Sequence, residues 1–319
     1  MLDSYAQRLI KKEKIHERKY DNIGKPKQIR TGQLSAALTA YSVGYKDSEN
    51  ISALLDFIAP PIPVGRRFEF KRANNAEAFY SESDDVRSIG AEFKRVQYSG
   101  ESVNEKTLNK GLTIRIDNDE VVGDKWQERY TAMLIQRLLR NELRRALAAL
   151  DAISTSADKV WDSSANPDED LRNALMLSAN ESGVRPNRIL FGESAWDMRA
   201  SCLEGQSTAG AFKSGAMTPD ELAQKLMLDS CKIVGARYQT ASGKTQMGSL
   251  NVYAFFAQNG ISKDEASNLK RFYTPTEDGT MFRVYCQEYA KYTDITVEHY
   301  SSIVACSNLG VRKLCVSAQ

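Results

Sequence analysis

The chain has only two histidines, His16 and His299, and they lie far apart in the sequence. A histidine-rich metal site is therefore excluded, and a Ser-His-Asp or Cys-His arrangement could use only one of them. His299 belongs to residues 294–300, where apolar and polar side chains alternate as in a β-strand. We therefore interpret His299 as a structural residue of a strand, and a catalytic role is the weaker alternative.

Residues 241–245, with the sequence Ala-Ser-Gly-Lys-Thr, resemble part of a phosphate-binding loop. The complete motif needs a glycine five residues before Gly243, and Tyr238 occupies that position. The residues after Thr245 are also a poor helix start, although a phosphate-binding loop leads directly into a helix. The sequence therefore predicts a polar hairpin turn here rather than a nucleotide site.

Carboxylates and cysteines give no catalytic pattern either. Asp84 and Asp85 fit a turn, and the acidic residues 168–170 fit the first turn of a helix, where the helix dipole favours negative charge. The five cysteines are odd in number and never spaced as Cys-x-x-Cys, so we expect free thiols in a reducing compartment. They are Cys202, Cys231, Cys286, Cys306 and Cys315. We predict no catalytic residue, no cofactor and no metal site, and we do not expect an enzyme.

The overall composition narrows the class of protein. The 319 residues contain 43 Lys plus Arg and 41 Asp plus Glu, so the net charge is 43 − 41 = +2, and 42% of residues are hydrophobic. The mean hydropathy of −0.46 is slightly polar for a compact globule of this length, which favours an elongated chain or one completed by neighbours. No stretch is apolar enough for a transmembrane helix. A near-neutral charge also argues against a dedicated DNA-binding protein.

One long helix is the first structural element that could position a functional site. Residues 124–153 have apolar side chains spaced three or four apart, which traces one face of a helix of roughly 45 Å at 1.5 Å per residue. The spaced residues are Ala132, Ile135, Leu139, Leu143, Ala146, Leu150 and Ile153. Such a helix is a scaffold rather than a loop that carries chemistry.

Residues 62–118 differ from the rest of the chain. Phe68 and Phe70 alternate with charged residues, and the segment has ten basic and nine acidic side chains but few aliphatic ones. Two further strands are expected at 93–98 and, as a short one, around Ile114 and Ile116. Because such a segment cannot easily bury a core of its own, we expect a long β-hairpin that projects from a body. Its charges would be matched by a neighbouring subunit or simply solvated.

The remaining chain predicts an arm and a mixed body. The first 30 residues have nine basic and four acidic side chains and predict a weakly amphipathic helical arm. A helix is expected at 33–40, and the proline-rich residues 57–64 predict an extended path. Helix starts are expected at Asn166 and Thr218, with a stop at Gly183. Further expected elements are strands at 187–191, 251–256, 294–299 and 311–316 and a helix at 194–203.

Five segments, taken in order, resemble those of a known family. They are the run 57–64 with the strand 66–70, the helix 124–153, the strand and helix 185–197, and the runs 294–300 and 311–314. Their order and spacing resemble the major capsid proteins of tailed bacteriophages, which have the Hong Kong 97-like fold. The resemblance spans nearly the whole chain. Residues 57–70 resemble the entry to the extended E-loop of that family, and residues 124–153 resemble its spine helix.

The resemblance implies an α+β chain with an N-terminal arm, an extended β-hairpin E-loop, a peripheral domain with a long spine helix, and an axial domain. The expected ranges are 1–61 for the arm, 62–118 for the E-loop, 119–160 for the peripheral domain with the spine helix, about 161–285 for the axial domain, and 286–319 for the closing strands of the peripheral domain. Charged residues in the E-loop are expected at contacts between subunits. These are Arg66, Arg67, Glu69, Lys71, Arg72, Asp84, Asp85, Arg87, Lys94 and Arg95.

The function implied is that of a structural major capsid protein. Pentamers and hexamers of it would form an icosahedral shell around double-stranded DNA, as a virion capsid assembled in the host bacterial cytoplasm. The implied partners are further copies of the chain, packaged DNA bound without sequence preference, a portal protein, and scaffolding and decoration proteins, with no membrane. No long scaffolding-like region precedes the arm in this sequence, so we expect a separate scaffolding protein or none.

Three alternatives stay open at the level of sequence. Within the same fold, the chain could be an encapsulin-like nanocompartment shell that encloses a protein cargo. An enzyme that uses His299 or the turn at 241–245 is an alternative from another class. A nucleic-acid-binding module that uses the basic first 30 residues is a third.

Overall fold

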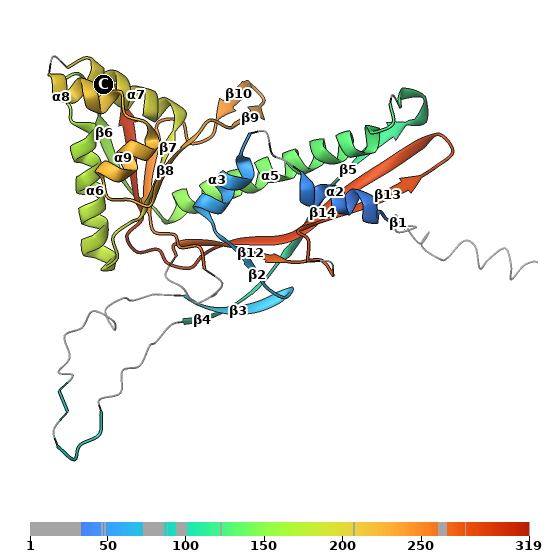
Figure 1. Cartoon of the computed structure of the whole chain (residues 1–319), viewed down its shortest axis with the longest axis horizontal. Coiled ribbons are helices and arrows are strands. Elements are labelled where there is room, and N and C mark those ends of the chain that lie inside the picture. Colours follow the sequence, from blue (N-terminus) through green and yellow to red (C-terminus); the bar gives the residue numbers. More distant parts are fainter. Residues whose placement is uncertain are drawn as a thin grey trace, which may run out of the picture.

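Figure 1 shows an elongated molecule in which a long helix and long strands run side by side, with a cluster of helices at one end. The computed structural model describes residues 33–45, 47, 49–72, 86–87, 89–93, 101–121, 123–206, 208–260, 267–277 and 279–318. The basic arm over residues 1–32 lies outside the described residues. So does most of the expected strand at 93–98, of which only Phe93 is described, with an exposed side chain.

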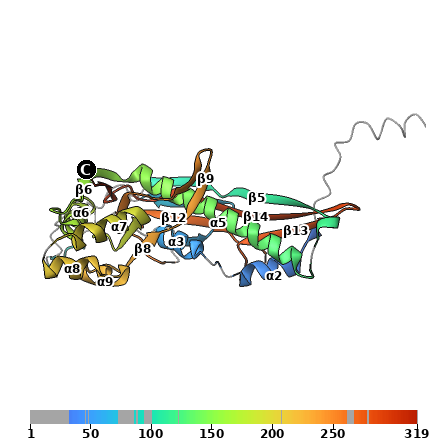
Figure 2. The same ribbon diagram turned by 90° about the horizontal axis from the view of Figure 1, so that it is seen from above.

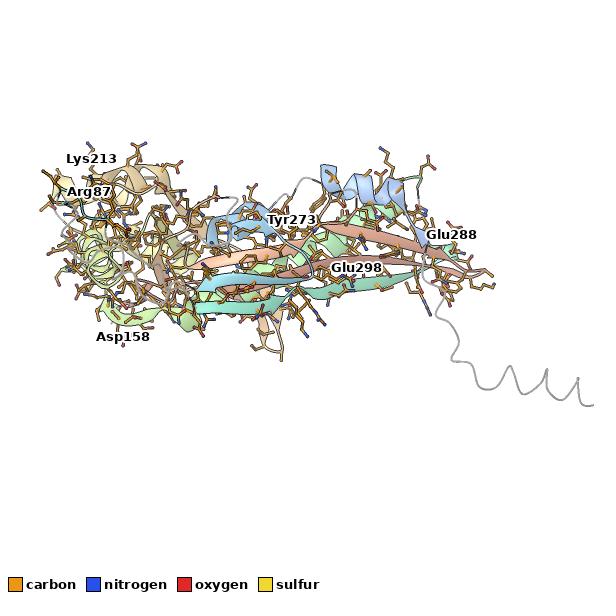
Figure 3. All side chains as sticks on the ribbon, turned by 90° about the horizontal axis from the view of Figure 1, so that it is seen from below. Arg87, Asp158, Lys213, Tyr273, Glu288 and Glu298 are labelled. Carbon is orange, nitrogen blue, oxygen red and sulfur yellow. The ribbon has the colours of Figure 1, made fainter. Side chains whose placement is uncertain are left out.

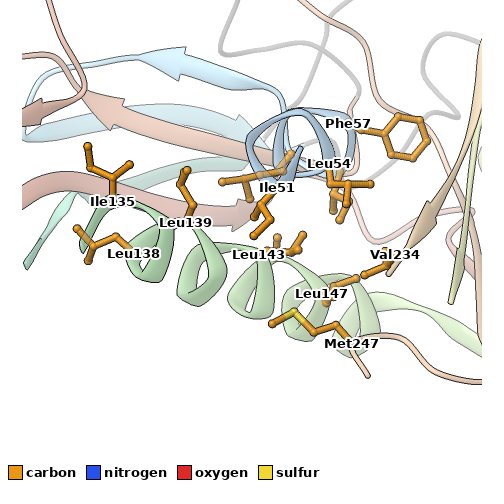
Figure 4. Close-up of a cluster of buried hydrophobic side chains, with 14 of the residues drawn as sticks. Ile51, Leu54, Phe57, Ile135, Leu138, Leu139, Leu143, Leu147, Val234 and Met247 are labelled. Atoms are coloured by element: carbon orange, nitrogen blue, oxygen red, sulfur yellow. The ribbon is translucent and has the colours of Figure 1, made fainter. Parts of the chain in front are cut away.

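The long helix α5 (Trp126–Ile153) has 28 residues, or about 42 Å at 1.5 Å per residue. It confirms the helix predicted from the apolar spacing. Two short helices, α2 (Ala36–Gly44) and α3 (Ile51–Ile58), pack against it. Figure 4 shows side chains of α3 and α5 meeting in a buried apolar cluster, which is the largest core of the described chain.

One six-stranded sheet supports α5. Its order is β1 (Gln33–Leu34), β13 (Phe282–Glu288), β14 (Tyr292–Ala305), β12 (Leu269–Thr274) and β2 (Pro61–Pro63), and β5 (Leu108–Asp117) pairs with β14. β14 is the central strand: it pairs antiparallel with β13 and then β12, and with ten residues of β5. The short strand expected around Ile114 and Ile116 is therefore a long one. Ile116 is buried in the main core.

A second, five-stranded sheet lies at the end of the molecule where the helices gather (Figure 1). Its order is β6 (Thr155–Val160), β15 (Arg312–Ser317), β11 (Asn251–Phe255), β7 (Arg188–Gly192) and β8 (Ser230–Val234). The flanking helices are α6 (Pro167–Ser182), α7 (Glu193–Glu204), α8 (Ala209–Gly215) and α9 (Pro219–Lys225). The strands expected at 187–191 and 251–256 and the helix at 194–203 are confirmed to within one residue.

The two sheets share a core through the alternation of side chains in β7 and β11. Ile189 and Phe191 of β7 belong to the apolar cluster under α6, α7 and α9. Leu190 belongs instead to the large cluster around α5. Tyr253 and Phe255 of β11 belong to that large cluster too. Both faces of these central strands are therefore buried, which is why they read as continuous apolar runs.

Local signals place the helix ends as expected. The Asn166 side chain accepts from the backbone of Glu169 at the start of α6, and Thr218 forms a capping box with Glu221 at the start of α9. Gly183 ends α6 with a positive φ of 71°, a conformation that glycine adopts without strain. Residues 241–245 lie in the turn and second strand of a hairpin, β9 (Arg237–Thr240) and β10 (Gly243–Gln246), as predicted instead of a nucleotide loop.

Two N-terminal expectations need correction. The helix expected at 33–40 begins later, because Ser35 caps it and residues 33–34 pair with β13. The extended path expected from Phe57 begins only after Ile58, because Ile51, Leu54, Leu55 and Ile58 form one buried face of α3. Proline then ends the helix, and the chain continues as β2.

The expected domain boundaries cut across the sheets. Residues 108–117, assigned to the E-loop, are β5 of the sheet that supports α5, and a short 3₁₀ helix (Asn118–Glu120) follows them. β12 and most of β13, assigned to the axial range 161–285, lie in that same sheet. β15, assigned to the closing strands of 286–319, pairs with β11 and β6 in the other sheet. Sequence order alone could not show the pairing of β5 with β14 or of β15 with β6 and β11, because these strands lie far apart in the chain.

Candidate assembly interface

The expected E-loop leaves the body through a two-stranded base. β3 (Arg67–Arg72) pairs antiparallel with β4 (Glu101–Lys106), and the strands lie beside β12 in Figure 1. Phe68 and Phe70 point to one side, as their alternation predicts, and their ring centroids lie 4.4 and 5.5 Å from that of Phe272 in β12. Ile62, Val304 and Cys306 complete this small core. The base is therefore fixed to the main sheet by aromatic packing.

The opposite side of this base is exposed and charged. It carries Arg67, Glu69 and Lys71, and the Ser102 hydroxyl donates to the Glu69 carboxylate. Arg67 lies directly across from Lys106 in the β3–β4 register. Like charges in opposed positions of a strand pair repel each other, at a cost of a few tenths to about 1 kcal/mol. Carboxylates from another surface would relieve this repulsion.

Arg66 makes contacts within its own chain. Its guanidinium lies over the Tyr300 ring, 4.3 Å from the centroid, and donates to the Tyr300 hydroxyl at 2.8 Å. Tyr300 belongs to β14, so Arg66 helps to hold the hairpin base against the main sheet. We had expected Arg66 at a contact between subunits. The geometry gives it a partner inside the subunit.

The other expected contact residues fall into two groups. Arg72 ends β3 half-buried, and Arg87 lies over the Phe93 ring at 4.9 Å, with both side chains exposed. Asp84, Asp85, Lys94 and Arg95 lie outside the described residues. The structure therefore brings together the residues at 66–72. It adds Lys106, which the sequence reasoning missed because only the strand register places it opposite Arg67.

A buried ionic cluster lies between α5 and the main sheet. Glu142 is 2% exposed and accepts from Lys110 of β5 at 2.8 Å, from Arg145 at 2.6 Å and from the Ser301 hydroxyl at 2.9 Å. Burial by itself would raise the pKa of Glu142, but the neighbouring His299 and Lys110 outweigh burial and hold this pKa below its ordinary value. The cluster therefore holds a charged carboxylate in the core and ties α5 to β5 and β14.

His299 belongs to that cluster as a buried residue of β14. Its Nε2 atom lies 3.8 Å from the Glu142 carboxylate, and its ring meets Phe282 edge-on at 5.2 Å. The side chain is 2% exposed in β14, so no substrate could reach it from solvent. This agrees with the interpretation of His299 as a structural strand residue. Within the described residues, no group of three or more His, Cys, Asp or Glu side chains could hold a metal ion.

A second buried cluster joins the helices of the smaller core. Asp168 of α6 accepts from the fully buried Arg199 of α7 at 2.8 Å and from Lys225 of α9 at 2.7 Å. Arg199 and Lys225 also bind Ser214 of α8. Burial would raise the pKa of Asp168, but Arg199 and Lys225 outweigh it and lower this pKa. The acidic run at 168–170 thus serves packing as well as the helix start.

Charge is otherwise spread over the whole surface. Figure 3 shows charged side chains along the full length, from Asp158 near one end to Glu288 at the other. Among the described residues, no helix has both the length and the apolar character needed to span a membrane. All five cysteines are free thiols in the structure.

Solved structures that share this fold include phage proteins. No protein-family model and no curated protein matches the sequence. A phage-related protein from Bordetella bronchiseptica RB50 superposes with a TM-score of 0.66 and 16% identity, over 89% of this chain and 98% of that one. Microbacterium phage Oxtober96 gives 0.51 and 12%, over 92% and 94%. The mature capsid of bacteriophage PhiM1 gives 0.50 and 10%, over 92% and 93%.

These similarities establish the fold. The chain is similar to phage capsid proteins in structure, which confirms the resemblance predicted from its sequence. Helices and strands are mixed as the α+β prediction requires. At identities this low, the comparison speaks for the fold and not for a particular partner or activity.

Proposed function

We propose that this chain is a structural major capsid protein, which assembles as pentamers and hexamers into an icosahedral shell around double-stranded DNA. The observation that carries the proposal is the match of fold to the mature capsid subunit of PhiM1 over 92% of this chain. Closed symmetric assemblies bury surface that an elongated monomer leaves exposed. The elongated body and its charged hairpin base fit such a role.

The four named parts of the capsid fold are assigned within this proposal. The E-loop leaves the body through β3 and β4, α5 is the spine helix, and the five-stranded sheet with α6–α9 is the axial domain. The arm stays proposed for residues 1–61, of which α2 and α3 pack into the core around α5. The sheet pairings favour placing β5, β12 and β13 with the spine helix in the peripheral domain. The axial domain then also includes β6 and β15.

The exposed side of the hairpin base is the proposed contact between subunits. Arg67 and Lys106 would meet carboxylates of a neighbouring copy, while Phe68 and Phe70 keep the base on its own subunit. Exposed ion pairs contribute only about 0–1 kcal/mol each, but symmetry repeats every pair around the shell. Packaged DNA, a portal protein, and scaffolding and decoration proteins are the further partners proposed, and the virion capsid is the proposed location.

Particle analysis tests this function. The full-length protein, expressed alone and with co-expressed scaffolding protein, should sediment as capsomers or closed shells, and electron microscopy should show icosahedral particles. A stable monomer under every condition would overturn the proposal. Particles from cells that produce the complete phage should contain DNA. Shells filled with a protein cargo and free of DNA would identify a nanocompartment instead.

DNA binding by the unassembled protein separates the shell from the nucleic-acid-binding alternative. With a net charge of +2, isolated capsomers should bind duplex DNA weakly and release it at moderate salt. Filter binding over a salt series measures this. Tight, sequence-selective binding would favour a nucleic-acid-binding module.

A further inference from the structure

A basic groove runs between α3, the exposed side of α5 and the β9–β10 hairpin. The hairpin stands out from the body in Figure 2, and it forms one wall of the groove. The groove has a volume of about 1240 Å³, more than the roughly 300–1,000 Å³ of a typical small-molecule pocket. Six cationic residues and one carboxylate, Glu49, line it. The cations are Arg137, Arg140, Arg144, Lys232, Arg237 and Lys244.

The cations are only partly neutralised by the chain itself. Arg140 pairs with Glu49, and Arg237 pairs with Glu193 at 2.6 Å. In the described part of the chain, no carboxylate lies within salt-bridge distance of Arg137, Arg144 or Lys244, and all three side chains are exposed. Three positive charges from two separate elements therefore converge on one hollow without an anion.

The spacing on α5 explains why these charges share one wall. Met133, Arg137, Arg140 and Arg144 follow each other at intervals of four, three and four residues, which keeps them on one side of a helix. The buried side of α5 faces the main sheet, so this basic row faces away from it. The Arg144 guanidinium lies 5.8 Å from the centroid of the Tyr238 ring, which bridges the row to β9.

Apolar side chains form the floor and rim of the same groove. Leu54 and Met247 belong to the main core and also line the groove, and Figure 4 shows both beside α5. Met133, at the rim, is 55% exposed. A ligand that fits this lining needs negative charge on its edges and apolar groups that reach the floor.

We propose that this groove binds a short polypeptide segment of a partner protein, rich in acidic residues and carrying apolar side chains between them. The proposal does not depend on closed-shell assembly. The first 30 residues of this chain have nine basic and four acidic side chains, so their charge excludes them as the occupant. Duplex DNA presents phosphates on a rigid convex surface and has no apolar side chain for Leu54 and Met247. An extended peptide meets both requirements.

A displayed library of random 12-residue peptides, selected on immobilised full-length subunits, tests the proposal. The selected sequences should be enriched in Asp or Glu together with Leu, Met or Phe. The Arg137→Gln, Arg144→Gln double variant should bind the selected peptides about tenfold more weakly, since each exposed pair contributes up to about 1 kcal/mol. Fluorescence anisotropy with the labelled peptides measures this change.

The matched control is Arg129→Gln, another exposed arginine of α5 that lies outside the groove. It should bind the peptides as the wild type does. The proposal is overturned if no acidic sequences are enriched, or if both variants bind equally. It is also overturned if a DNA duplex competes for Arg137 and Arg144 more strongly than the peptides, which would make the groove a phosphate site. Self-association that the double variant abolishes would instead assign the groove to a second copy.

Discussion

The body of the molecule and the β3–β4 strand pair, the hairpin base, carry their charges in opposite ways. In the body, the carboxylates of Glu142 and Asp168 are buried, and each has at least two cationic partners from its own chain. On the hairpin base, Arg67 lies opposite Lys106 on an exposed surface, and the strand register supplies no compensating partner across the pair. The buried carboxylates of the body are therefore neutralised within the chain, whereas the exposed Arg67–Lys106 pair is not.

The hydrophobic cores of the two regions also differ, because the body has large cores and the hairpin base has a small one. The body is built on two large clusters that share β7 and β11, whereas β3 and β4 rest on a small cluster around Phe68, Phe70 and Phe272. A two-stranded hairpin is at best marginally stable by itself in water, so the base depends on the sheet beneath it and on whatever covers its outer side. The comparison indicates that the body can fold by itself, and it agrees with the proposal that the hairpin base serves assembly.

Replacing residues 74–92 by a short Gly-Ser turn should have the largest effect, because it should abolish assembly and leave folding intact. We expect complete loss of particles, since we propose that this segment makes contacts between subunits, while the body still unfolds cooperatively at nearly the wild-type temperature. Sedimentation velocity and thermal unfolding give the two readouts. An unfolded product would show that the hairpin belongs to the folding core, and normal particles would refute the interface.

Removing the buried carboxylate in Asp168→Ala should have the largest effect on the body. It leaves Arg199, which is fully buried, without its anion, and loss of one partner of a buried pair costs about 3–5 kcal/mol. Urea unfolding of dissociated subunits measures the change in free energy of unfolding. Asp158→Asn, at an exposed position of β6, is the matched control and should change stability little. A small effect of Asp168→Ala would mean that the cluster does not stabilise the body.

Acid should weaken the body through the same cluster. Arg199 and Lys225 lower the pKa of Asp168 below its ordinary value of 3.8 in the folded state. The unfolded chain therefore takes up the proton first, and the stability from Asp168 is present above about pH 4 and is lost as the pH falls below it. Urea midpoints measured between about pH 6 and pH 3 should fall, and fall less in Asp168→Asn. Equal slopes for the two proteins would contradict this assignment.

Charge reversal in Lys106→Glu should have the smallest effect on stability. It should change subunit stability and assembly in opposite directions. It converts the like-charged pair with Arg67 into an opposite-charged one, so the isolated subunit should gain about 0.2–1 kcal/mol. The same change removes a positive charge from the proposed contact, so assembly should weaken. Unfolding of subunits and the critical concentration for assembly provide the test. Lower stability, or better assembly, would reverse the roles given to this pair.

Local features of the fold were predictable from sequence. Apolar spacing gave α5, and side-chain chemistry at Asn166, Thr218 and Gly183 gave helix ends, because each signal acts within a few residues. The sheet membership of β5 and β15 was not predictable, since it depends on pairing with strands that are far away in the chain. The expected domain ranges therefore divide strands that pair in one sheet.

The contacts of the candidate interface were likewise not predictable from local sequence. Composition identified the charged segment, but only the register shows that Lys106 faces Arg67. Arg66 lies 234 residues from Tyr300 in sequence, so nothing near it indicated an internal partner. The buried Glu142 cluster likewise joins α5 to β5 and β14, and no local pattern marks that glutamate as buried.

The most direct test is a reconstruction of assembled particles at a resolution that shows side chains. The account predicts a closed icosahedral shell in which carboxylates of a neighbouring subunit lie within salt-bridge distance of Arg67 and Lys106, while the Asp168 and Glu142 clusters stay internal to each subunit. A closed shell in which the outer side of β3 and β4 faces only solvent would contradict it.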